Sequence, residues 1–218
     1  TLGIGLSHKP TVEKRFGLSF DRPAAHMREY LSILKEVVET GRVDFAGEFY
    51  KVSAEIDSVT PAITPVLLAA MGPIMLRMAG ESAAGTVTWM VGPETLGGHI
   101  TPRINRAAAA AGRTGPRICV GLPLALTDDP RLARREAAKR FARYNLLPSY
   151  RRMMDMEGAA GPEDMAIVGN EEEVESQIHA LATAGATDLA AWVFPERSDA
   201  GESVDRAMAL LKSLVGQL

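Results

Sequence analysis

The sequence is poor in cysteine, in aromatic residues and in excess charge. Cys119 is the single cysteine among 218 residues, which excludes an internal disulfide and is typical of a reducing compartment. The formal net charge is −3, so the charge balance does not indicate nucleic acid or an anionic membrane as a partner. No apolar run could span a bilayer, and we see no signal peptide. We expect a cytoplasmic protein that acts on a small molecule, with no nucleic-acid or membrane partner.

Motifs of several enzyme classes are also missing. The sequence has neither G-x-G-x-x-G nor G-x-x-x-x-G-K-[ST], which weakens the case for a nucleotide-binding open sheet. It has no G-x-S-x-G, the turn that presents the nucleophile in many serine hydrolases. No set of His, Cys, Asp and Glu has the spacing of metal ligands, so we expect no metal.

What is present is an alternation of short apolar runs with helical segments. We expect strands over residues 1–6, 66–70, 86–91, 117–126 and 187–194, with a short extended piece at 166–169. Helices between them predict an α/β fold with parallel pairing and right-handed crossovers. A doubly wound open sheet and part of a (β/α) barrel both fit. In a barrel, the chemistry would lie after the strands, at residues 6–9, 70–73, 91–94, 126–129 and 194–197.

Local signals place several boundaries. Asp21 precedes Pro23 and is expected to cap a helix, as Asn170 is for the helix that begins at Glu171. Gly85 is expected to end the helix that follows Pro73. Residues 43–52 alternate around Gly47, which predicts a small hairpin.

The stretch from Pro65 to Gly85 is the most informative in the chain. An apolar strand runs into Met71-Gly72-Pro73, and a helix follows. The free N–H groups and the positive dipole end of such a helix start would favour a phosphate. An ordinary connection, in which Gly72 only makes the turn, is the alternative.

Four segments in order carry a family resemblance: GIGLSHKP, VDFAGEFYKV, PVLLAAMGPIMLRMAGESAAG and TWMVGPETL. Together they resemble the luciferase-like monooxygenase family, and most of all its deazaflavin-dependent branch. The resemblance implies a single (β/α)8 TIM-barrel domain over residues 1–218, with only about the last five βα units. The resemblance further implies that the first three units are absent, which places Thr1 near the fourth strand. The exposed sheet edges that this would leave predict a homo-oligomer, for example a dimer.

The resemblance also assigns site residues. It places the cofactor along Gly5, Leu6, Ser7 and His8, and its phosphate at the turn formed by Ala69, Ala70, Met71, Gly72 and Pro73. His8 is the candidate catalytic residue, because an imidazole there could donate to a ring carbonyl or carry a proton. It could equally bond the loop backbone. Trp89 would wall a substrate pocket if it points into the barrel.

Other side chains are weaker candidates. Lys9 and Arg197 could meet phosphate or the polyglutamate tail of a deazaflavin, although solvated surface is the simpler interpretation. His26, His99 and His179 fall in helices, where we expect surface or packing roles.

Three functions are consistent with these observations. The first is an oxidoreductase that passes a hydride between coenzyme F420 and an unknown organic substrate. The second is an FMN-dependent monooxygenase of the same family. The third is a shortened, non-enzymatic barrel that acts as an assembly or binding module.

Overall fold

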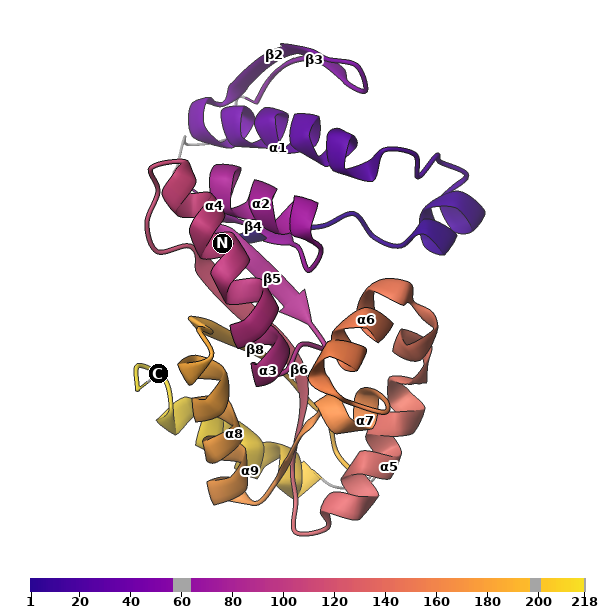
Figure 1. Ribbon diagram of the computed structural model, residues 1–218, viewed down its shortest axis with the longest axis vertical. Helices are drawn as coiled ribbons and strands as arrows, with labels where there is room; N and C mark the ends of the chain where they lie inside the picture. The colour runs from indigo at the N-terminus through magenta and orange to yellow at the C-terminus, as the bar shows by residue number, and fades with distance from the viewer. Residues whose placement is uncertain (57–63, 197–200, 218) are drawn as a thin grey trace. The chain divides into compact units, whose positions relative to one another are not determined.

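The computed structural model describes residues 1–56, 64–196 and 201–217 and shows an α/β fold (Figure 1). Its strands are β1 (Leu2–Ile4), β2 (Arg42–Ala46), β3 (Lys51–Glu55), β4 (Val66–Ala69), β5 (Gly85–Trp89), β6 (Arg117–Leu126), β7 (Ile167–Gly169) and β8 (Asp188–Val193). Its α-helices are α1 (Pro23–Thr40), α2 (Pro73–Ser82), α3 (Pro93–Thr95), α4 (Thr101–Ala110), α5 (Pro130–Arg140), α6 (Pro148–Glu157), α7 (Pro162–Met165), α8 (Glu171–Thr183) and α9 (Gly201–Ser213). Three shorter helical turns are η1 (Thr11–Arg15), η2 (Leu96–Ile100) and η3 (Ala142–Leu146).

The pairing confirms the predicted parallel sheet. The strand order is β1-β4-β5-β6-β7, and β8 also pairs with β6. β1 lies parallel to β4, with Ile4 opposite Leu68. β6 is long enough to pair in parallel with two strands, β8 along 119–124 and β7 along 124–126. The hairpin of β2 and β3 is antiparallel and forms a separate sheet, as residues 43–52 predicted.

The chain folds into two compact units. The first comprises residues 1–86 and 104–116, and the second comprises 87–103 and 117–218. β5 begins in the first unit and continues in the second.

In the first unit, β4 forms the centre of the core. Its first three residues, Val66, Leu67 and Leu68, are buried. Apolar side chains of the two helices are buried with them: Met27 and Leu31 of α1, and Met75, Leu76 and Met78 of α2. The hairpin lies over α1 (Figure 1).

α2 is held in place by α4 and by the loop that follows it. A Cβ on Gly80 would lie 2.6 Å from the carbonyl oxygen of Ile104, so this glycine lets the two helices approach closely. The guanidinium of Arg113 donates to the carbonyl oxygens of Glu81 and Ala83, at 3.3 and 2.6 Å. These carbonyls belong to the end of α2, where a cation is favoured by the helix dipole.

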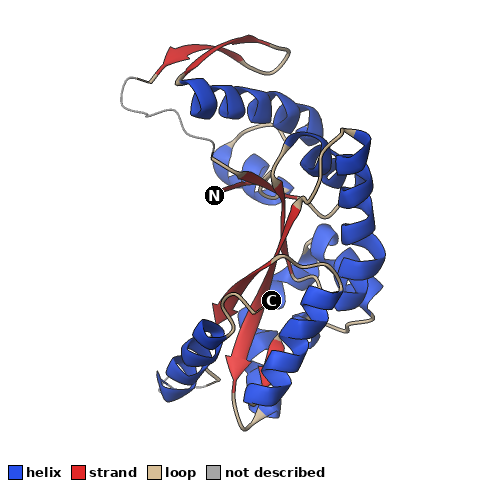
Figure 2. Cartoon of the chain, turned by 90° about the vertical axis from the view of Figure 1, so that its left-hand side faces the viewer, coloured by secondary structure: helices blue, strands red, loops and turns tan. Residues whose placement is uncertain are grey.

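In the second unit, β6 is buried along most of its length, and helices α5, α8 and α9 pack on β6, β7 and β8 (Figure 2). Asn170 caps α8 as predicted: its side chain accepts from the Glu173 N–H, and the Glu173 carboxylate accepts in return from the Asn170 N–H. This reciprocal pair is the capping box.

Two predicted boundaries were wrong. Asp21 does not cap α1, because its carboxylate accepts from the Ser19 hydroxyl instead, and Arg22 occupies the cap position with φ 49°. Gly85 does not end α2, which stops at Ser82. The chain is already extended at Ala83 and Gly85 opens β5.

Candidate functional site

The first candidate site lies where β1 and β4 end, in the first unit. The two strands run in parallel register, so Gly5 follows β1 beside the end of β4. A Cβ on Gly5 would lie only 2.8 Å from the Cβ of Ala69, closer than real Cβ atoms come. The structure thus brings together the two segments to which the sequence analysis assigned a cofactor.

The turn after β4 is hydrogen-bonded to a buried threonine on one side and has free space beside Gly72 on the other. The buried hydroxyl of Thr86 lies 2.9 Å from the carbonyl oxygens of both Leu68 and Ala70, and its proton can serve either one. Gly72 is extended, at φ −84° and ψ 155°, and Pro73 begins α2. Among the described residues, no side chain caps this helix, and a Cβ on Gly72 would meet no atom within 4 Å. No described side chain therefore occupies the start of α2, and a bound anion could accept from the N–H groups of its first turn.

The loop after β1 is conformationally unusual. Ser7 has φ 59°, a left-handed conformation that non-glycine residues rarely adopt and that costs free energy. The next residue, His8, accepts at its carbonyl oxygen from the N–H groups of Thr11 and Val12, both at 2.9 Å. His8 thus starts η1 through its backbone. The chemical role of its imidazole stays a prediction.

The two weaker basic candidates have different outcomes. Lys9 is exposed and forms an ion pair with Glu13, at 3.7 Å, one helical turn away. This agrees with a solvated surface residue. Arg197 lies outside the residues that the structure describes.

A cavity of about 720 Å³ adjoins the end of β1. It is lined by Ile4, Gly5, Leu6, Val12, Leu18, Ser19, Phe20, Asp21, Pro23, His26, Met27, Tyr30 and Tyr50. Its volume falls in the range of small-molecule sites, and it combines apolar walls with a few polar groups. Ring contacts organise one wall: the His26 ring lies 3.8 Å from that of Phe49 and edge-on to that of Tyr50 at 5.7 Å. The packing role expected for His26 is confirmed, and this residue also lines the cavity.

Glu29 fixes that wall by attaching the hairpin to α1. Its carboxylate accepts from the N–H groups of Glu48, Phe49 and Tyr50, at 2.8, 2.9 and 3.1 Å. Desolvation favours the neutral acid, but these three hydrogen bonds and the nearby His26 outweigh it and lower the pKa of Glu29. The charged form of Glu29 therefore holds the hairpin turn in place.

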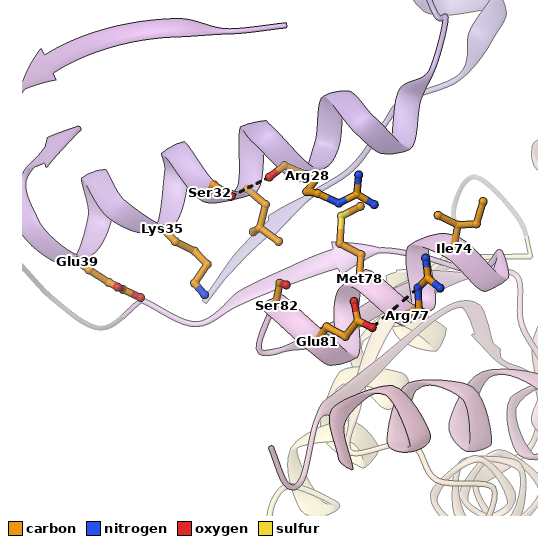
Figure 3. Close-up of a pocket in the computed structure, with 10 residues that line it drawn as sticks. Arg28, Ser32, Lys35, Glu39, Ile74, Arg77, Met78, Glu81 and Ser82 are labelled. Atoms are coloured by element: carbon orange, nitrogen blue, oxygen red, sulfur yellow. Dashed lines mark hydrogen bonds and ion pairs between the residues drawn. The ribbon is translucent and has the colours of Figure 1, made fainter. Parts of the chain in front are cut away.

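A second cavity, of about 320 Å³, lies between α1 and α2 (Figure 3). Arg28 and Lys35 extend from α1, and Met78 reaches toward them from α2 (Figure 3). Charges of both signs line it, since Glu39 and Glu81 accompany the basic residues. This mixture does not select an anion, so we do not assign the cofactor here.

Trp89, the last residue of β5, belongs to an aromatic cluster in the second unit. Its ring lies 5.5 Å from that of Trp192 on β8, and 6.1 and 5.8 Å from those of Phe141 and Tyr144. The indole nitrogen of Trp89 is buried and has no hydrogen-bond partner among the described residues. The structure thus places Trp89 beside a cavity of about 360 Å³ bordered by Phe141, Tyr144 and Trp192.

The second unit also contains a second Gly-Pro helix start, and this one is closed. Gly92 and Pro93 follow β5, and the Glu157 carboxylate accepts from the N–H groups of Glu94 and Thr95, at 3.0 and 2.8 Å. A Cβ on Gly92 would lie 2.3 Å from a Glu157 carboxylate oxygen, so only glycine leaves room for it. An internal carboxylate therefore holds the place that an anion would take, in contrast to the open turn at Gly72.

Comparison with known proteins identifies the family. The family model for luciferase-like monooxygenases matches residues 1–188. The chain belongs to the luciferase-like monooxygenase family. This agrees with the resemblance found in the sequence and with the parallel α/β fold.

One curated relative and two solved structures of the same fold are similar to this chain. An F420-dependent glucose-6-phosphate dehydrogenase of Rhodococcus jostii is 30% identical over 185 residues, which are 78% of this chain and 55% of that protein. The coenzyme F420-dependent tetrahydromethanopterin reductase of Methanopyrus kandleri shares the fold, with a TM-score of 0.70 and 22% identity over 96% of this chain and 71% of that one. A type II Baeyer–Villiger monooxygenase of Pseudomonas putida, solved with FMN, has a TM-score of 0.67 and 21% identity. The match covers 96% of this chain and 68% of that one. The chain spans about half the length of the curated relatives it matches.

Sequence reasoning missed several residues of the candidate sites. Glu29 and the hairpin N–H groups are about twenty positions apart, and Glu157 lies more than sixty positions from the turn it caps. Tyr50 was predicted only as part of a hairpin. No local pattern marks such contacts.

Among residues 1–56, 64–196 and 201–217, no helix is both long and apolar enough to cross a membrane. Within the same residues, no three His, Cys, Asp or Glu side chains gather as metal ligands would. The oligomeric state stays a prediction.

Proposed function

We propose that this chain is part of a coenzyme F420-dependent oxidoreductase and carries its cofactor-phosphate turn. The observation that supports this most is the contrast between two Gly-Pro helix starts. Among the residues that the structure describes, no side chain caps the turn at Gly72 and none fills its Cβ position, whereas the turn at Gly92 holds the Glu157 carboxylate. An anionic group is favoured at an open helix start and repelled by a carboxylate.

The residues at the open turn fit such a cofactor. The N–H groups at the start of α2 would hold the phosphate, and the segment from Gly5 to His8 would run beside the ring system. Gly5 suits this position because the ends of β1 and β4 already touch there. When bound, coenzyme F420 supplies the hydride chemistry, and the protein orients it and excludes water. In this proposal the imidazole of His8 holds or moves a proton near the ring.

FMN is the second candidate cofactor, because a neighbour of the same fold was solved with FMN. A phosphate turn serves either cofactor equally well. The two candidates differ in the ring system and in the use of oxygen.

A fluorescence titration of the chain with coenzyme F420 and, separately, with FMN tests the proposal. We expect saturable binding of F420 that inorganic phosphate reverses by competition. Tighter binding of FMN, with oxygen-dependent turnover, would mean that the cofactor is FMN and not F420. Failure to bind either cofactor would refute the site and favour a binding or assembly module.

A further inference from the structure

The cavity beside Trp89 carries an inference of its own. We propose that this cavity binds a planar aromatic carboxylate. This ligand would be the substrate of the oxidoreductase proposed above, and only that assignment rests on the proposed function. The cavity has a volume of about 360 Å³ and is lined by Arg140, Phe141, Arg143, Tyr144, Trp192 and Phe194. This volume suits a small organic molecule.

The aromatic walls favour a flat ligand. The Phe141 ring lies edge-on to Trp192 and to Phe194, each at 5.7 Å, and Trp89 lies behind at 5.5 Å from Trp192. These separations are those of paired aromatic rings, so a further ring would find several partners of the same geometry. Trp192 is 54% exposed, although most tryptophans are largely buried, so much of its face is open to a ligand.

A single glycine creates the space for this arrangement. A Cβ on Gly121 of β6 would lie 2.6 Å from the Thr88 carbonyl oxygen and 2.9 Å from a ring carbon of Trp89. The Trp89 ring therefore occupies the place of a side chain at position 121. Any larger residue there would displace the indole and change the wall of the cavity.

Two arginines give the cavity a positive rim. The Arg143 guanidinium lies 4.9 Å from the Tyr144 ring centroid and donates to the Tyr144 hydroxyl at 3.0 Å. Arg140 lies 6.0 Å from the Phe194 ring centroid and pairs through its Nε with Glu136 at 2.7 Å. Arg143 thus donates to a neutral hydroxyl, and a planar guanidinium with further N–H donors suits a carboxylate.

The position of the cavity agrees with a substrate site. Trp89 ends β5, and Phe194 directly follows β8, where its N–H donates to the Leu124 carbonyl oxygen at 2.9 Å. In barrels of parallel strands, reactions take place at these carboxyl ends.

The chain has two tryptophans, and both lie in this cluster, which allows a direct measurement. A proton–nitrogen correlation spectrum of the whole chain contains two indole N–H signals, and naphthoate is titrated without any cofactor. We expect saturable shifts of these signals, with naphthalene-methanol, a neutral analogue, binding about tenfold more weakly because it lacks the charge-assisted hydrogen bond.

Two variants separate charge from shape. Arg143→Gln should weaken naphthoate binding about tenfold and leave the neutral analogue unchanged. Arg135→Gln removes a charge from exposed surface of α5 outside the cavity lining and should change neither. Absence of indole shifts, or equal affinity for the anion and the neutral analogue, would overturn the proposal.

A flavin or deazaflavin ring is itself planar, and each cofactor carries a negatively charged phosphate group, so the source of the ligand is tested separately. If FMN saturates the indole shifts and blocks naphthoate, the cavity belongs to the cofactor ring, and the substrate assignment is refuted. If naphthoate still binds with FMN present, the assignment is supported. Failure of the phosphate turn at Gly72 leaves the naphthoate result unaffected, so the two proposals can fail independently.

Discussion

Replacing Gly72 by aspartate should raise stability and weaken cofactor binding in the same molecule. The backbone at Gly72 is extended, at φ −84° and ψ 155°, and an added Cβ meets no described atom within 4 Å. Aspartate can therefore enter without strain and cap the uncapped start of α2. A better cap, the helix dipole and a less flexible unfolded chain together give about 1 kcal/mol of added stability.

The same carboxylate would stand where the phosphate is proposed to bind. Two unit charges about 5 Å apart repel by about 1–3 kcal/mol when the effective dielectric constant lies between about 80 and 20. We therefore expect Gly72→Asp to weaken F420 binding roughly tenfold to a hundredfold. The two effects have opposite signs, which a general disruption of the fold would not produce.

Chemical denaturation and a fluorescence titration on the same sample measure both effects. Gly72→Asn is the matched control, because it supplies a neutral cap and should keep most of the affinity. Gly98→Asp adds the same charge at an exposed glycine with open space in the second unit and should not weaken binding. Unchanged affinity in Gly72→Asp would refute the phosphate turn, and a loss of stability would refute the open geometry.

Three further predictions follow from close contacts. Gly5→Ala should lower the free energy of unfolding in urea by about 1–3 kcal/mol, because the new Cβ overlaps that of Ala69. Gly3→Ala should lower it much less, because a Cβ there meets no described atom within 4 Å. Glu157→Ala should cost about 0.5–2 kcal/mol through loss of a cap, and adding Gly92→Ala should cost little more in a double-mutant cycle. The lowered pKa of Glu29 stabilises the hairpin above its unfolded pKa, and this stabilisation is lost as the pH falls through the folded value. The protection factor of the Phe49 amide, which corrects exchange for its intrinsic pH dependence, should accordingly fall in acid, and Glu29→Gln should abolish that fall; an unchanged profile of protection against pH would contradict this role.

The sequence predicted the features that depend on neighbouring residues. The strand, glycine turn and helix from Val66 onward are confirmed, because burial and turn chemistry act locally there. The same holds for the Asn170 cap, whose partner is three residues away. The hairpin around Gly47 is confirmed for the same reason.

The errors arose where two local options compete. Asp21 is a good cap by type, but the Ser19 hydroxyl engages its carboxylate first, and Arg22 takes the left-handed cap position. Gly85 is a plausible helix end, yet Ala84 already donates its N–H to the Val66 carbonyl oxygen, so the chain has left the helix by then. Sequence patterns cannot rank such alternatives, because the deciding partner is chosen by the folded chain.

The candidate site was predictable in part. Parallel pairing implied that the segments after β1 and β4 would meet, and the contact between Gly5 and Ala69 shows that they do. The aromatic cluster was not predictable, since Trp89 lies about fifty residues from Phe141 and one hundred from Trp192. Such contacts follow from topology alone.

The division of the chain into two units has a consequence for biosynthesis. Each unit is assembled from two separate stretches, so the polypeptide passes from one to the other after residues 86, 103 and 116. A ribosome must therefore deliver residue 116 before the first unit can close, by which time one segment of the second has already emerged. No single cut in the gene can separate the units cleanly, because a cut after residue 86 leaves residues 104–116 attached to the second unit and a cut after residue 116 leaves residues 87–103 attached to the first. Expressing the first unit alone would require a new linker between residues 86 and 104, and expressing the second alone would require one between residues 103 and 117.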